Sequence, residues 1–479
     1  MNTLAVSFAL YTAGIAVIGL LSTKVSRGTQ SDFLLADRGL GAWVAGLSSA
    51  ASAESGWVTL GLVGFAFTNG ISAYWVVPGT VAAFLFNWFV LGPRLHRLAQ
   101  EHQALTVPDV LACQFRGPLA AAIRLISVAV LLTMLTAYAA AQFNSAGKMF
   151  AATFGWEYAT GVVAGTAIVL IYTVTGGFRA IAWTDVVQAI FMVGALVLIP
   201  MILISQLGGL ERTWTLLNQG EDGGTVTHWL GRRSGIELVA FATLWFGIPL
   251  GNPGQPHVMI RIMATKDRTA ILRGGIISAL WVTVLFTGAV TLGLTARAKF
   301  GQLPDPEQAL PLLAADVSVV SPVVGGLVLA AILAAICSTA DSQLLVSATS
   351  ISHDLMRVLR GHSESGKSNI LLDRVTILVV GILAAAIALT EVRSVFDFVL
   401  AYGWAGLGAT FGPAMILILL NRKTTAAGVC SGMVTGFVIA VSWRMFLPEW
   451  NAVVYNLVPA FFGSLIMCVV VSHFTAKTA

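Results

Sequence analysis

The chain has 479 residues, of which 27 are Lys or Arg and 22 are Asp or Glu, so charged residues make up only 10% of it. An ordinary soluble domain carries about 25% charged residues, and a soluble protein of this length could not cover its surface with so few. The composition, 57% hydrophobic with 48 glycines, excludes a disordered chain, a disulfide scaffold and a nucleic-acid-binding protein. It indicates a polytopic membrane protein.

Apolar windows long enough to cross a bilayer, about 20 residues each, recur along the chain about thirteen times. We expect them at residues 3–22, 40–67, 72–92, 120–143, 158–175, 184–206, 236–256, 274–296, 318–352, 372–391, 396–420, 424–446 and 452–473. No polar stretch between them is long enough for a separate soluble domain. The expected fold is therefore an all-α integral membrane protein with a single transmembrane domain over residues 1–479.

The distribution of basic residues predicts the orientation in the membrane. Lys24 and Arg27 follow the first apolar run rather than precede it, which argues against a signal peptide and places the N-terminus outside, because basic residues gather in cytoplasmic loops. The other predicted inner loops carry Arg94, Arg97, Arg179, Arg261, Lys266, Arg268, Arg273, Arg357, Arg360, Lys367, Arg422 and Lys423. An odd number of spans then puts the C-terminus in the cytoplasm of a multi-pass protein of the cell (inner or plasma) membrane.

Two of the expected spans are interrupted. The second contains the small, polar run SSAASAESG at residues 48–56, and the seventh contains three prolines and three glycines between residues 247 and 256. Polar backbone is tolerated at membrane depth only where it lines a site or cavity, and interrupted helices at matching positions of two halves point to a transporter's binding site. We predict a five-plus-five inverted-repeat core that works by alternating access. Its parts are a first flanking helix in 1–30, repeats in 40–206 and 236–420, and C-terminal flanking helices in 424–479.

Three carboxylates, those of Glu54, Asp185 and Asp341, lie inside apolar runs, where a charge costs at least about 2.5 kcal/mol. Helical spacing puts Ser338, Asp341 and Ser342 on one face, and oxygen ligands of this kind suit a small hard cation. We therefore predict a cation site at Asp185 and Asp341. The alternative is a buried carboxylate that pairs with a basic residue, and Glu54 could equally face a cavity.

Several segments resemble the sodium/solute symporter family, and most closely its sodium/proline symporters. They read ASAESGW at 51–57, YTVTGGF at 172–178 with WTD at 183–185, GQPH at 254–257, STADSQLL at 338–345 and LTVPD at 105–109. The similarity covers the chain from about residue 30 to residue 420. It implies sodium-coupled symport of a small organic solute, with proline first, and a transporter rather than an enzyme. Sodium would be the coupling ion and no other cofactor is expected.

The resemblance also implies the site residues. Sodium would bind backbone carbonyls of Ala51, Glu54 and Ala335 and the hydroxyls of Ser338 and Thr339. A second sodium, which some members carry, would involve Asp185, Ser338, Asp341 and Ser342. The solute site would comprise Ser55, Trp57, Tyr138, Trp245, Asn252, Gln255 and Pro256. The expected partners are therefore the solute, sodium and the lipid bilayer, with neither nucleic acid nor a nucleotide.

The solute site departs from the sodium/proline symporter pattern. Those symporters have an acid at the position of Ala53, an uncharged residue at that of Glu54, and aromatic residues at those of Ile248 and Asn252. Trp245 could compensate from the next helical turn. The solute thus stays open between proline and another carboxylate, a sugar acid or an osmolyte. A channel or sensor on the same fold is a further alternative.

One motif matches a nucleotide-binding pattern and so indicates an ATP-driven or enzymatic membrane protein. Residues 361–368 read GHSESGKS and match the phosphate-binding pattern GxxxxGK[ST]. That motif requires a strand before it and a helix after it within an α/β domain, whereas here it lies in a short connection between two apolar runs.

We predict that Lys367→Ala leaves solute uptake unchanged, because the residue is a solvated loop charge. The measurement is initial uptake at matched protein level. Loss of uptake by a folded variant would favour a nucleotide-driven function instead.

Overall fold

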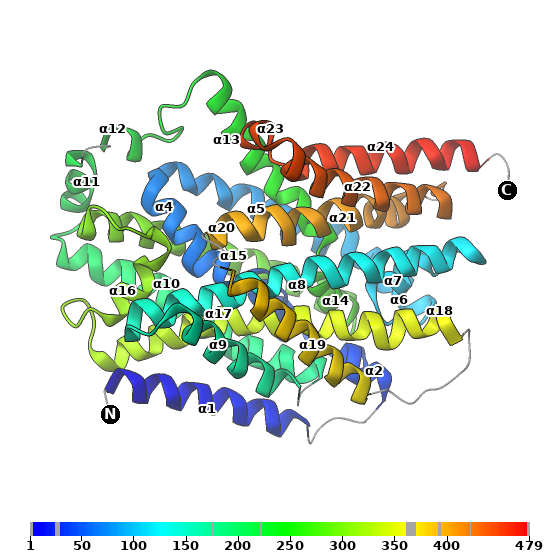
Figure 1. Cartoon of the computed structure of the whole chain (residues 1–479), viewed down its shortest axis with the longest axis horizontal. Coiled ribbons are helices and arrows are strands. Elements are labelled where there is room, and N and C mark those ends of the chain that lie inside the picture. Colours follow the sequence, from blue (N-terminus) through cyan, green and yellow to red (C-terminus); the bar gives the residue numbers. More distant parts are fainter. Residues whose placement is uncertain are drawn as a thin grey trace.

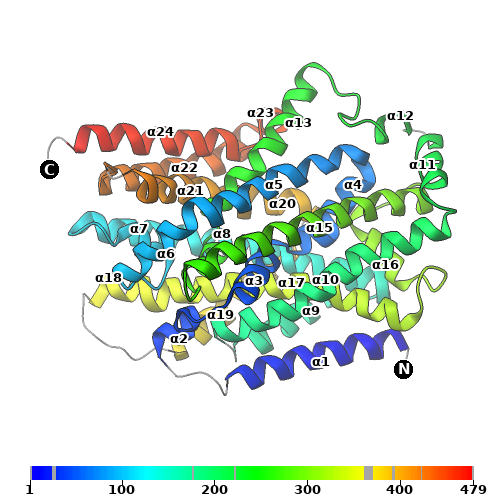
Figure 2. The same cartoon turned by 180° about the vertical axis from the view of Figure 1, so that it is seen from behind.

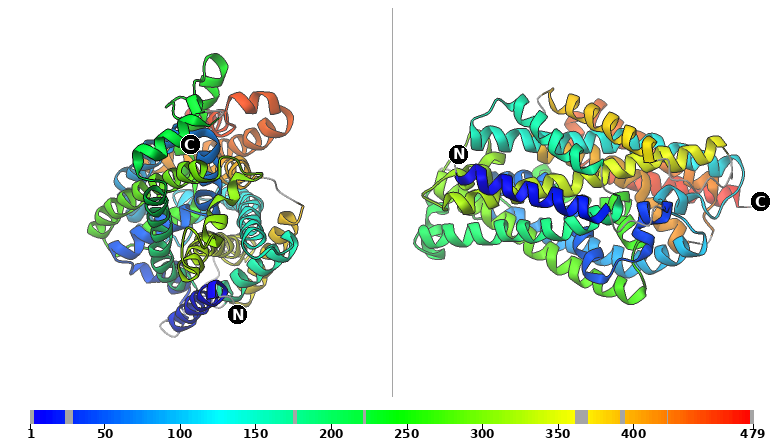
Figure 3. Two further views of the ribbon diagram at one scale, coloured as in Figure 1. Left: turned by 90° about the vertical axis from the view of Figure 1, so that its left-hand side faces the viewer. Right: turned by 90° about the horizontal axis from the view of Figure 1, so that it is seen from below.

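The computed structural model describes residues 3–23, 29–174, 177–220, 223–360, 370–390, 394–421 and 423–476. Within these ranges the chain is helical, apart from one isolated β-bridge between Leu40 and Thr265. The helices form one elongated bundle, with α1 (Thr3–Thr23) along one edge and α24 (Leu457–Thr475) along the other (Figures 1, 2 and 3). The start of α1 and the end of α24 lie at opposite ends of this bundle.

The helices are described in the order of the two ranges predicted as repeats, and these repeat boundaries stay a prediction. The first half contains α3 (Ala42–Ala53), η2 (Trp57–Leu62), α4 (Val63–Asn69), η3 (Gly70–Trp75), α5 (Val76–Leu85), η4 (Phe86–Leu91), α6 (Gly92–Glu101), α7 (Val107–Ala112), α8 (Pro118–Phe154), α9 (Tyr158–Thr173) and α10 (Phe178–Gln206). The second contains α13 (Gly235–Gly247), η5 (Ile248–Gly254), α14 (Pro256–Met263), α15 (Arg268–Phe300), η6 (Pro306–Gln308), α16 (Ala309–Ala315), α17 (Pro322–Thr349), η7 (Ser350–Leu355), α18 (Met356–Arg360), α19 (Ile370–Ala388), α20 (Val395–Phe398), η8 (Val399–Trp404) and α21 (Ala405–Leu420). The remaining short and flanking helices are α2 (Gln30–Leu35), η1 (Ala36–Arg38), α11 (Leu210–Gln219), α12 (Gly223–Val226), α22 (Ala426–Phe446) and α23 (Pro448–Val453).

The predicted fold class is confirmed. In the described ranges, 10 helices are long and apolar enough to cross a membrane, and α1 and α9 add shorter apolar stretches. The number of about thirteen spans stays a prediction, because residues 57–101 form one helical run of 45 residues while α3 is a separate short helix. The motif at 361–368, the loop residues Lys24 and Arg27, and Thr175 and Gly176 lie outside the described residues.

Both predicted interruptions are present. Helix α3 ends at Ala53, Glu54 is extended (φ −101°, ψ 87°), and the chain turns helical again at Trp57. Between η5 and α14, Gln255 has almost the same backbone geometry (φ −93°, ψ 99°). The two halves therefore break at matching positions with matching conformations, as an inverted repeat requires.

Small residues bring the broken helices to the centre of the bundle. A Cβ atom at Gly46 of α3 would lie 2.7 Å from the backbone oxygen of Gly274 of α15, so this close approach needs glycine. Helix α17 is the innermost span, with 83% of its apolar window buried compared with 33% for α24. Polar side chains on α3 and α17 are thereby held away from lipid.

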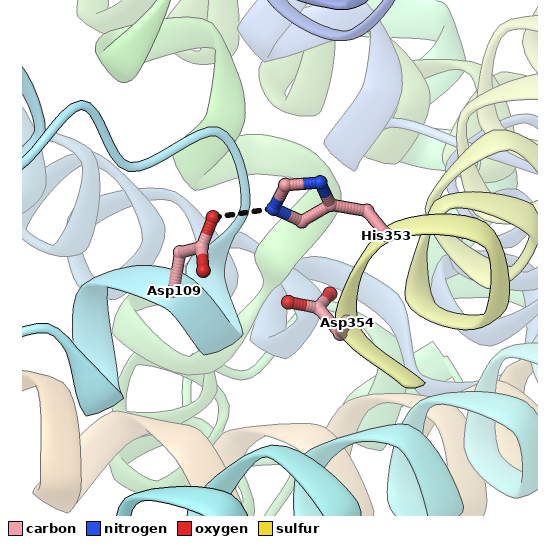
Figure 4. A group of neighbouring side chains, drawn as sticks. All are labelled: Asp109, His353 and Asp354. Carbon is pink, nitrogen blue, oxygen red and sulfur yellow. Dashed lines mark hydrogen bonds and ion pairs between the residues drawn. The ribbon is translucent and has the colours of Figure 1, made fainter. Parts of the chain in front are cut away.

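An ion-pair cluster joins α7, α8 and η7 at the end of the bundle where α24 finishes. Asp109 accepts hydrogen bonds from Arg124 and, at 2.9 Å, from Arg357. His353 Nε2 lies 2.7 Å from Asp109 Oδ2, and Asp354 lies beside this pair (Figure 4). Burial alone would raise the pKa of Asp109, but His353, Arg124 and Arg357 together hold that pKa well below its usual range.

The same cluster has the side-chain types of a metal site. Asp109, His353 and Asp354 each offer a ligand atom, and these atoms lie within 4.8 Å of one another. However, Arg124 and Arg357 already bind Asp109, and Arg124 is 3.6 Å from Asp354. Two guanidinium cations at this place repel a metal cation, so the cluster is a structural ion-pair network.

Replacement of Asp109 by Asn should lower the free energy of unfolding by about 3–5 kcal/mol, because two arginines lose their buried partner. A carboxylate whose folded pKa is depressed stabilises the protein above its unfolded pKa of about 3.9 and loses this effect as the pH falls through the folded value. The difference between wild type and variant should therefore shrink in acid. Thermal unfolding in detergent at several pH values measures it.

The control is Glu101→Gln, which removes the partner of Arg97 in an exposed pair and should cost less than about 0.5 kcal/mol. Equal destabilisation by Glu101→Gln and Asp109→Asn would contradict a special role for the buried cluster.

Candidate functional site

The break after α3 faces two hydroxyl groups of α17. Ser338 Oγ donates a hydrogen bond to the Ala51 carbonyl at 3.0 Å, and it lies 3.2 Å from the Ala335 carbonyl of its own helix. Thr339 Oγ1 donates to the Ser52 carbonyl at 3.2 Å. Carbonyls in the last turn of a helix have no partner further along the helix, so α3 offers these oxygens to α17 in the buried core of the bundle.

This geometry brings together most of the predicted sodium ligands. Ala51, Ala335, Ser338 and Thr339 are all buried; Ser338 contacts the carbonyls of Ala51 and Ala335, and Thr339 contacts the neighbouring Ser52 carbonyl. Glu54 is the extended residue at the break, and its side chain is fully buried. Carbonyl and hydroxyl oxygens converge here without a full negative charge among them, a set that suits a weakly held monovalent cation.

Asp185 of α10 is the centre of a second polar network. Its Oδ2 accepts hydrogen bonds from Ser48 at 2.6 Å and from Ser52 at 3.3 Å. Arg261 Nη2 lies 3.1 Å from the same oxygen, in an ion pair whose side chains are 1% and 0% exposed. Arg261 Nη2 also donates to Ser342 Oγ at 2.6 Å. The network joins α3, α10, α14 and α17.

The position of Arg261 corrects the sequence analysis, which counted it among the charges of an inner loop. Helix α14 extends from the break at Gln255 to Met263, so Arg261 lies within the buried half-helix. Asp185 thus has the basic partner that the alternative interpretation required. Of the residues predicted for a second sodium, Asp185 and Ser342 are both bound by Arg261, and Asp341 Oδ1 lies 3.1 Å from the Ser342 hydroxyl.

A central cavity lies beside the α3 break. Its lining comes from both halves of the chain: Ala53, Trp57, Thr80, Phe84, Tyr138, Ile248, Phe286, Val399, Leu400 and Trp404. Most of these side chains are aliphatic or aromatic. Among the described residues, Trp57 Nε1 and Thr80 Oγ1 are buried without a hydrogen-bond partner, so the cavity offers a few polar groups on apolar walls, as small-molecule sites do.

Two of the predicted solute residues, Trp57 and Tyr138, line this cavity. Ser55 is not among the lining residues, and its hydroxyl accepts a hydrogen bond from the Trp57 backbone N–H at 3.0 Å. Gln255 bonds the carbonyls of Gly251 and Trp404, each at 3.2 Å.

The other predicted solute residues lie outside the cavity lining. Asn252 accepts a hydrogen bond from Asn87 at 2.6 Å, and Trp245 packs edge-on against Phe65, with ring centroids 5.3 Å apart. Pro256 begins α14 behind the break. Trp245 therefore does not replace the missing aromatic residues within this cavity.

Phe396 of α20 separates the central cavity from a larger outer pocket. Its ring stacks on Trp57 and on Phe65, with centroid distances of 5.4 and 4.7 Å. The outer pocket has a volume of about 660 Å³ and contacts Phe65, Phe396 and Leu400, whereas the central cavity is closed down to about 20 Å³. Phe396 and Leu400 thus form the partition between the two spaces.

A buried carboxylate holds this partition in place. Glu307 accepts hydrogen bonds from the backbone N–H groups of Val395 and Phe396, each at 3.0 Å, and from the Ser394 hydroxyl at 3.1 Å. Lys148 Nζ lies 2.5 Å from Glu307 and neutralises it. The start of α20, and with it the Phe396 ring, is therefore fixed by a carboxylate of η6 and a lysine of α8.

Comparison with known proteins gives consistent matches. A family model described as "Sodium:solute symporter family" matches residues 33–436. The sodium/proline symporter of Escherichia coli strain K12 is 34% identical over 468 residues, which cover 96% of this chain and 91% of that protein. The osmoregulated proline transporter OpuE of Bacillus subtilis strain 168 is 31% identical over 479 residues, covering 99% and 95%.

Two solved structures share the fold. One is a Na+-coupled sialic acid symporter in a substrate-bound outward-open state, with a TM-score of 0.81, 18% identity, and coverage of 99% of this chain and 98% of that one. The other is Mhp1, a nucleobase-cation-symport-1 family transporter in a closed conformation, with a TM-score of 0.56, 13% identity, and coverage of 93% and 95%. At these identities the likeness concerns the fold alone.

Proposed function

Since the chain belongs to the sodium:solute symporter family, and is thus a multi-pass membrane protein that couples solute transport to sodium, we propose that its solute is proline or a closely related amino acid. The relatives named for proline transport match nearly the whole chain. The observation that carries the proposal is the position of the central cavity directly beside the α3 break, with Trp57 in the cavity wall.

We place the coupling sodium between the two helices at this break. Carbonyl oxygens of α3 and the hydroxyls of Ser338 and Thr339 of α17 would be its ligands. A sodium ion between these ligands would hold α3 and α17 together. Only a few residues after the end of α3, the chain reaches Ser55 and then Trp57 in the cavity wall. Sodium binding therefore orders the wall against which the solute packs. By linkage, the solute favours sodium binding to the same degree.

The side chains that line the cavity suit a small solute with an apolar ring, and the cavity, at about 20 Å³, would have to open to admit it. Ile248 forms part of its wall, and Phe84, Phe286 and Trp404 supply aromatic surface from other helices. Asn252, whose side chain could have favoured a more polar solute, lies outside the cavity lining, and its Oδ1 accepts a hydrogen bond from Asn87. The Trp57 and Thr80 donors are suited to a carboxylate. These features favour proline over a sugar acid or a strongly polar osmolyte.

In alternating access, Phe396 would move to open the central cavity to the outer pocket, and the ion-pair cluster at Asp109 would break to open the cavity on the other side. We place the two repeats at 40–206 and 236–420, with the N-terminus outside and the C-terminus in the cytoplasm. The start of α1 and the end of α24 lie at opposite ends of the bundle, which supports termini on opposite sides of the membrane.

Ser338→Ala and Thr339→Ala should each raise the sodium concentration for half-maximal uptake by about tenfold, equivalent to about 1.4 kcal/mol, because each removes an oxygen ligand. Sodium-dependent uptake into proteoliposomes measures the effect. Ser347→Ala is the matched control, since this buried α17 hydroxyl bonds only the Gln343 carbonyl of its own helix among the described residues. Unchanged sodium dependence in both site variants would remove the proposed ion site.

Thr80→Val should raise the proline concentration for half-maximal uptake by about tenfold, because it replaces a cavity hydroxyl with a methyl group of similar size. Thr166→Val is the control, since that hydroxyl bonds the Val162 carbonyl within α9. In competition against labelled proline, unlabelled proline should outperform polar amino acids and other carboxylates. The reverse order would exclude proline as the principal solute.

A further inference from the structure

A basic pocket lies beside the Asp109 ion-pair cluster, at the end of the bundle where α24 finishes. It is formed by the links before and after α7, the first turns of α8 and the helix α18. Its volume is about 620 Å³, which is enough for a polar headgroup. Of the described residues that line it, Arg116, Arg124 and Arg357 are arginines, and Asp109 is the one carboxylate.

We propose that this basic pocket binds the phosphate headgroup of an anionic phospholipid, in the leaflet at the end of the bundle that we place in the cytoplasm. None of the pocket's residues lines the central cavity. The inference therefore goes beyond the proposed function, because it concerns a second ligand at a separate site.

The pocket holds more guanidinium donors than Asp109 uses. Arg124 and Arg357 each contact Asp109 through Nη1. Among the described residues, Nε and Nη2 of both arginines have no hydrogen-bond partner, and Arg116 has neither a hydrogen-bond nor an ion-pair partner. The Arg124 side chain is held in place, since only 11% of it is exposed. Free guanidinium donors of this kind are suited to phosphate oxygens.

The charges at the pocket favour an anion. Three arginines against the Asp109 carboxylate leave an excess of two positive charges in the lining, with His102 counted as neutral. Asp354, which is not part of the lining, lies 3.6 Å from Arg124 and still leaves an excess of one. A phosphate group with one negative charge would balance this excess, whereas a zwitterionic headgroup would not.

The start of α8 adds to the positive potential. This helix has 37 residues, begins at Pro118, and has Gly117 as its N-cap, so no side chain caps its first turn. Gly117 and Ala120 both line the pocket. The N-terminal end of a long helix carries a partial positive charge and N–H groups without partners in the helix. It therefore supports the arginines in holding an anion.

Apolar side chains beside the pocket favour a lipid over a soluble phosphate. Leu119 and Leu125 of α8 are 45% and 43% exposed, and Leu359 of α18 is 67% exposed. Each of these leucines directly adjoins a lining residue in the sequence. Exposed leucines at the end of a membrane-spanning helix can contact acyl chains while the arginines contact the phosphate. Basic pockets between such helices on the cytoplasmic side are a known form of anionic-lipid site.

A bound headgroup would strengthen the connection that Asp109 makes. Arg116 precedes α8, Arg124 belongs to α8, and Arg357 belongs to α18. One phosphate group in contact with these arginines would therefore join the same helices as the ion-pair cluster. A ligand that binds the folded protein in this way raises its apparent stability by mass action.

The test titrates the purified full-length protein, in a non-ionic detergent, with short-chain phosphatidylglycerol and follows the temperature of thermal unfolding. We expect a saturable rise with this lipid and none with short-chain phosphatidylcholine, whose headgroup has no net charge. Arg116→Gln should raise the half-saturating lipid concentration about fivefold, because it removes the arginine that has no other partner. Arg116→Lys keeps the charge and should retain most of the affinity. The matched control is Arg268→Gln, an exposed arginine at the start of α15 that lies outside the pocket.

Inorganic phosphate and glycerol phosphate distinguish a lipid from a soluble anion. If either raises the unfolding temperature as much as phosphatidylglycerol at the same concentration, the pocket takes soluble phosphates and the lipid assignment is overturned. Equal shifts by phosphatidylglycerol and phosphatidylcholine, or the same half-saturating concentration in wild type, Arg116→Gln and Arg268→Gln, would also overturn it. Arg116 is exposed, so its replacement should leave the fold intact. Neither readout requires transport, so a negative result would leave the proposed function standing.

Discussion

Backbone carbonyls freed inside a bilayer must find partners, and this constraint organises the core of the protein. Both broken helices stop at membrane depth, at Glu54 and at Gln255. In the hydrocarbon region no water can form hydrogen bonds with these backbone groups, unless they line a water-filled cavity. The solution is a set of polar side chains on neighbouring helices: Ser338 and Thr339 bond the end of α3, and Gln142 Oε1 accepts from the Gly56 N–H at 2.9 Å. The groups that satisfy the break are also those that can hold an ion.

The rest of the bundle controls access to this centre. On one side, Lys148 and Glu307 fix the start of α20, so that Phe396 closes the central cavity from the outer pocket. On the other side, Asp109 and its two arginines connect α7, α8 and α18. Buried ion pairs contribute little net stability compared with apolar packing but are costly to break singly. Such ion pairs therefore suit helix contacts that must keep one conformation until all of the pairs in the network break together.

The sequence predicted the architecture because its signals were local. A run of small and polar residues at 48–56, and prolines and glycines at 247–256, stand out against apolar neighbours, and both mark real breaks. Ser338 contacts the Ala51 carbonyl and Thr339 contacts the Ser52 carbonyl, while the sodium ligands implied by the family resemblance stay a prediction. Arg261 was missed because it follows a proline-rich apolar run by only a few residues, so that its place inside a half-helix looks like a loop in sequence. Only the contact with Asp185, 76 positions away along the chain, reveals its role.

The solute cavity was the least predictable part. Phe84, Phe286 and Trp404 lie in ordinary apolar runs, where a residue facing a cavity has the same chemical character as one facing lipid. Asn252 indicated a polar pocket in the sequence, yet it lies outside the cavity lining, where its Oδ1 accepts a hydrogen bond from Asn87 of a separate apolar run. The cavity is lined by side chains from five or more helices, and no local sequence pattern indicates which side chains will contact one another there.

Whether sodium alone drives solute transport is measured by the limit of proline accumulation in proteoliposomes without ATP. One sodium ion entering down a tenfold gradient supplies about 1.4 kcal/mol. A membrane potential of about 100 mV adds about 2.3 kcal/mol per charge, and the sum sustains roughly 500-fold accumulation of a zwitterion. We expect accumulation to approach this limit and to collapse when the sodium gradient and the potential are dissipated. Proline that only equilibrates across the membrane, or whose accumulation is independent of sodium, would show that sodium does not drive the transport.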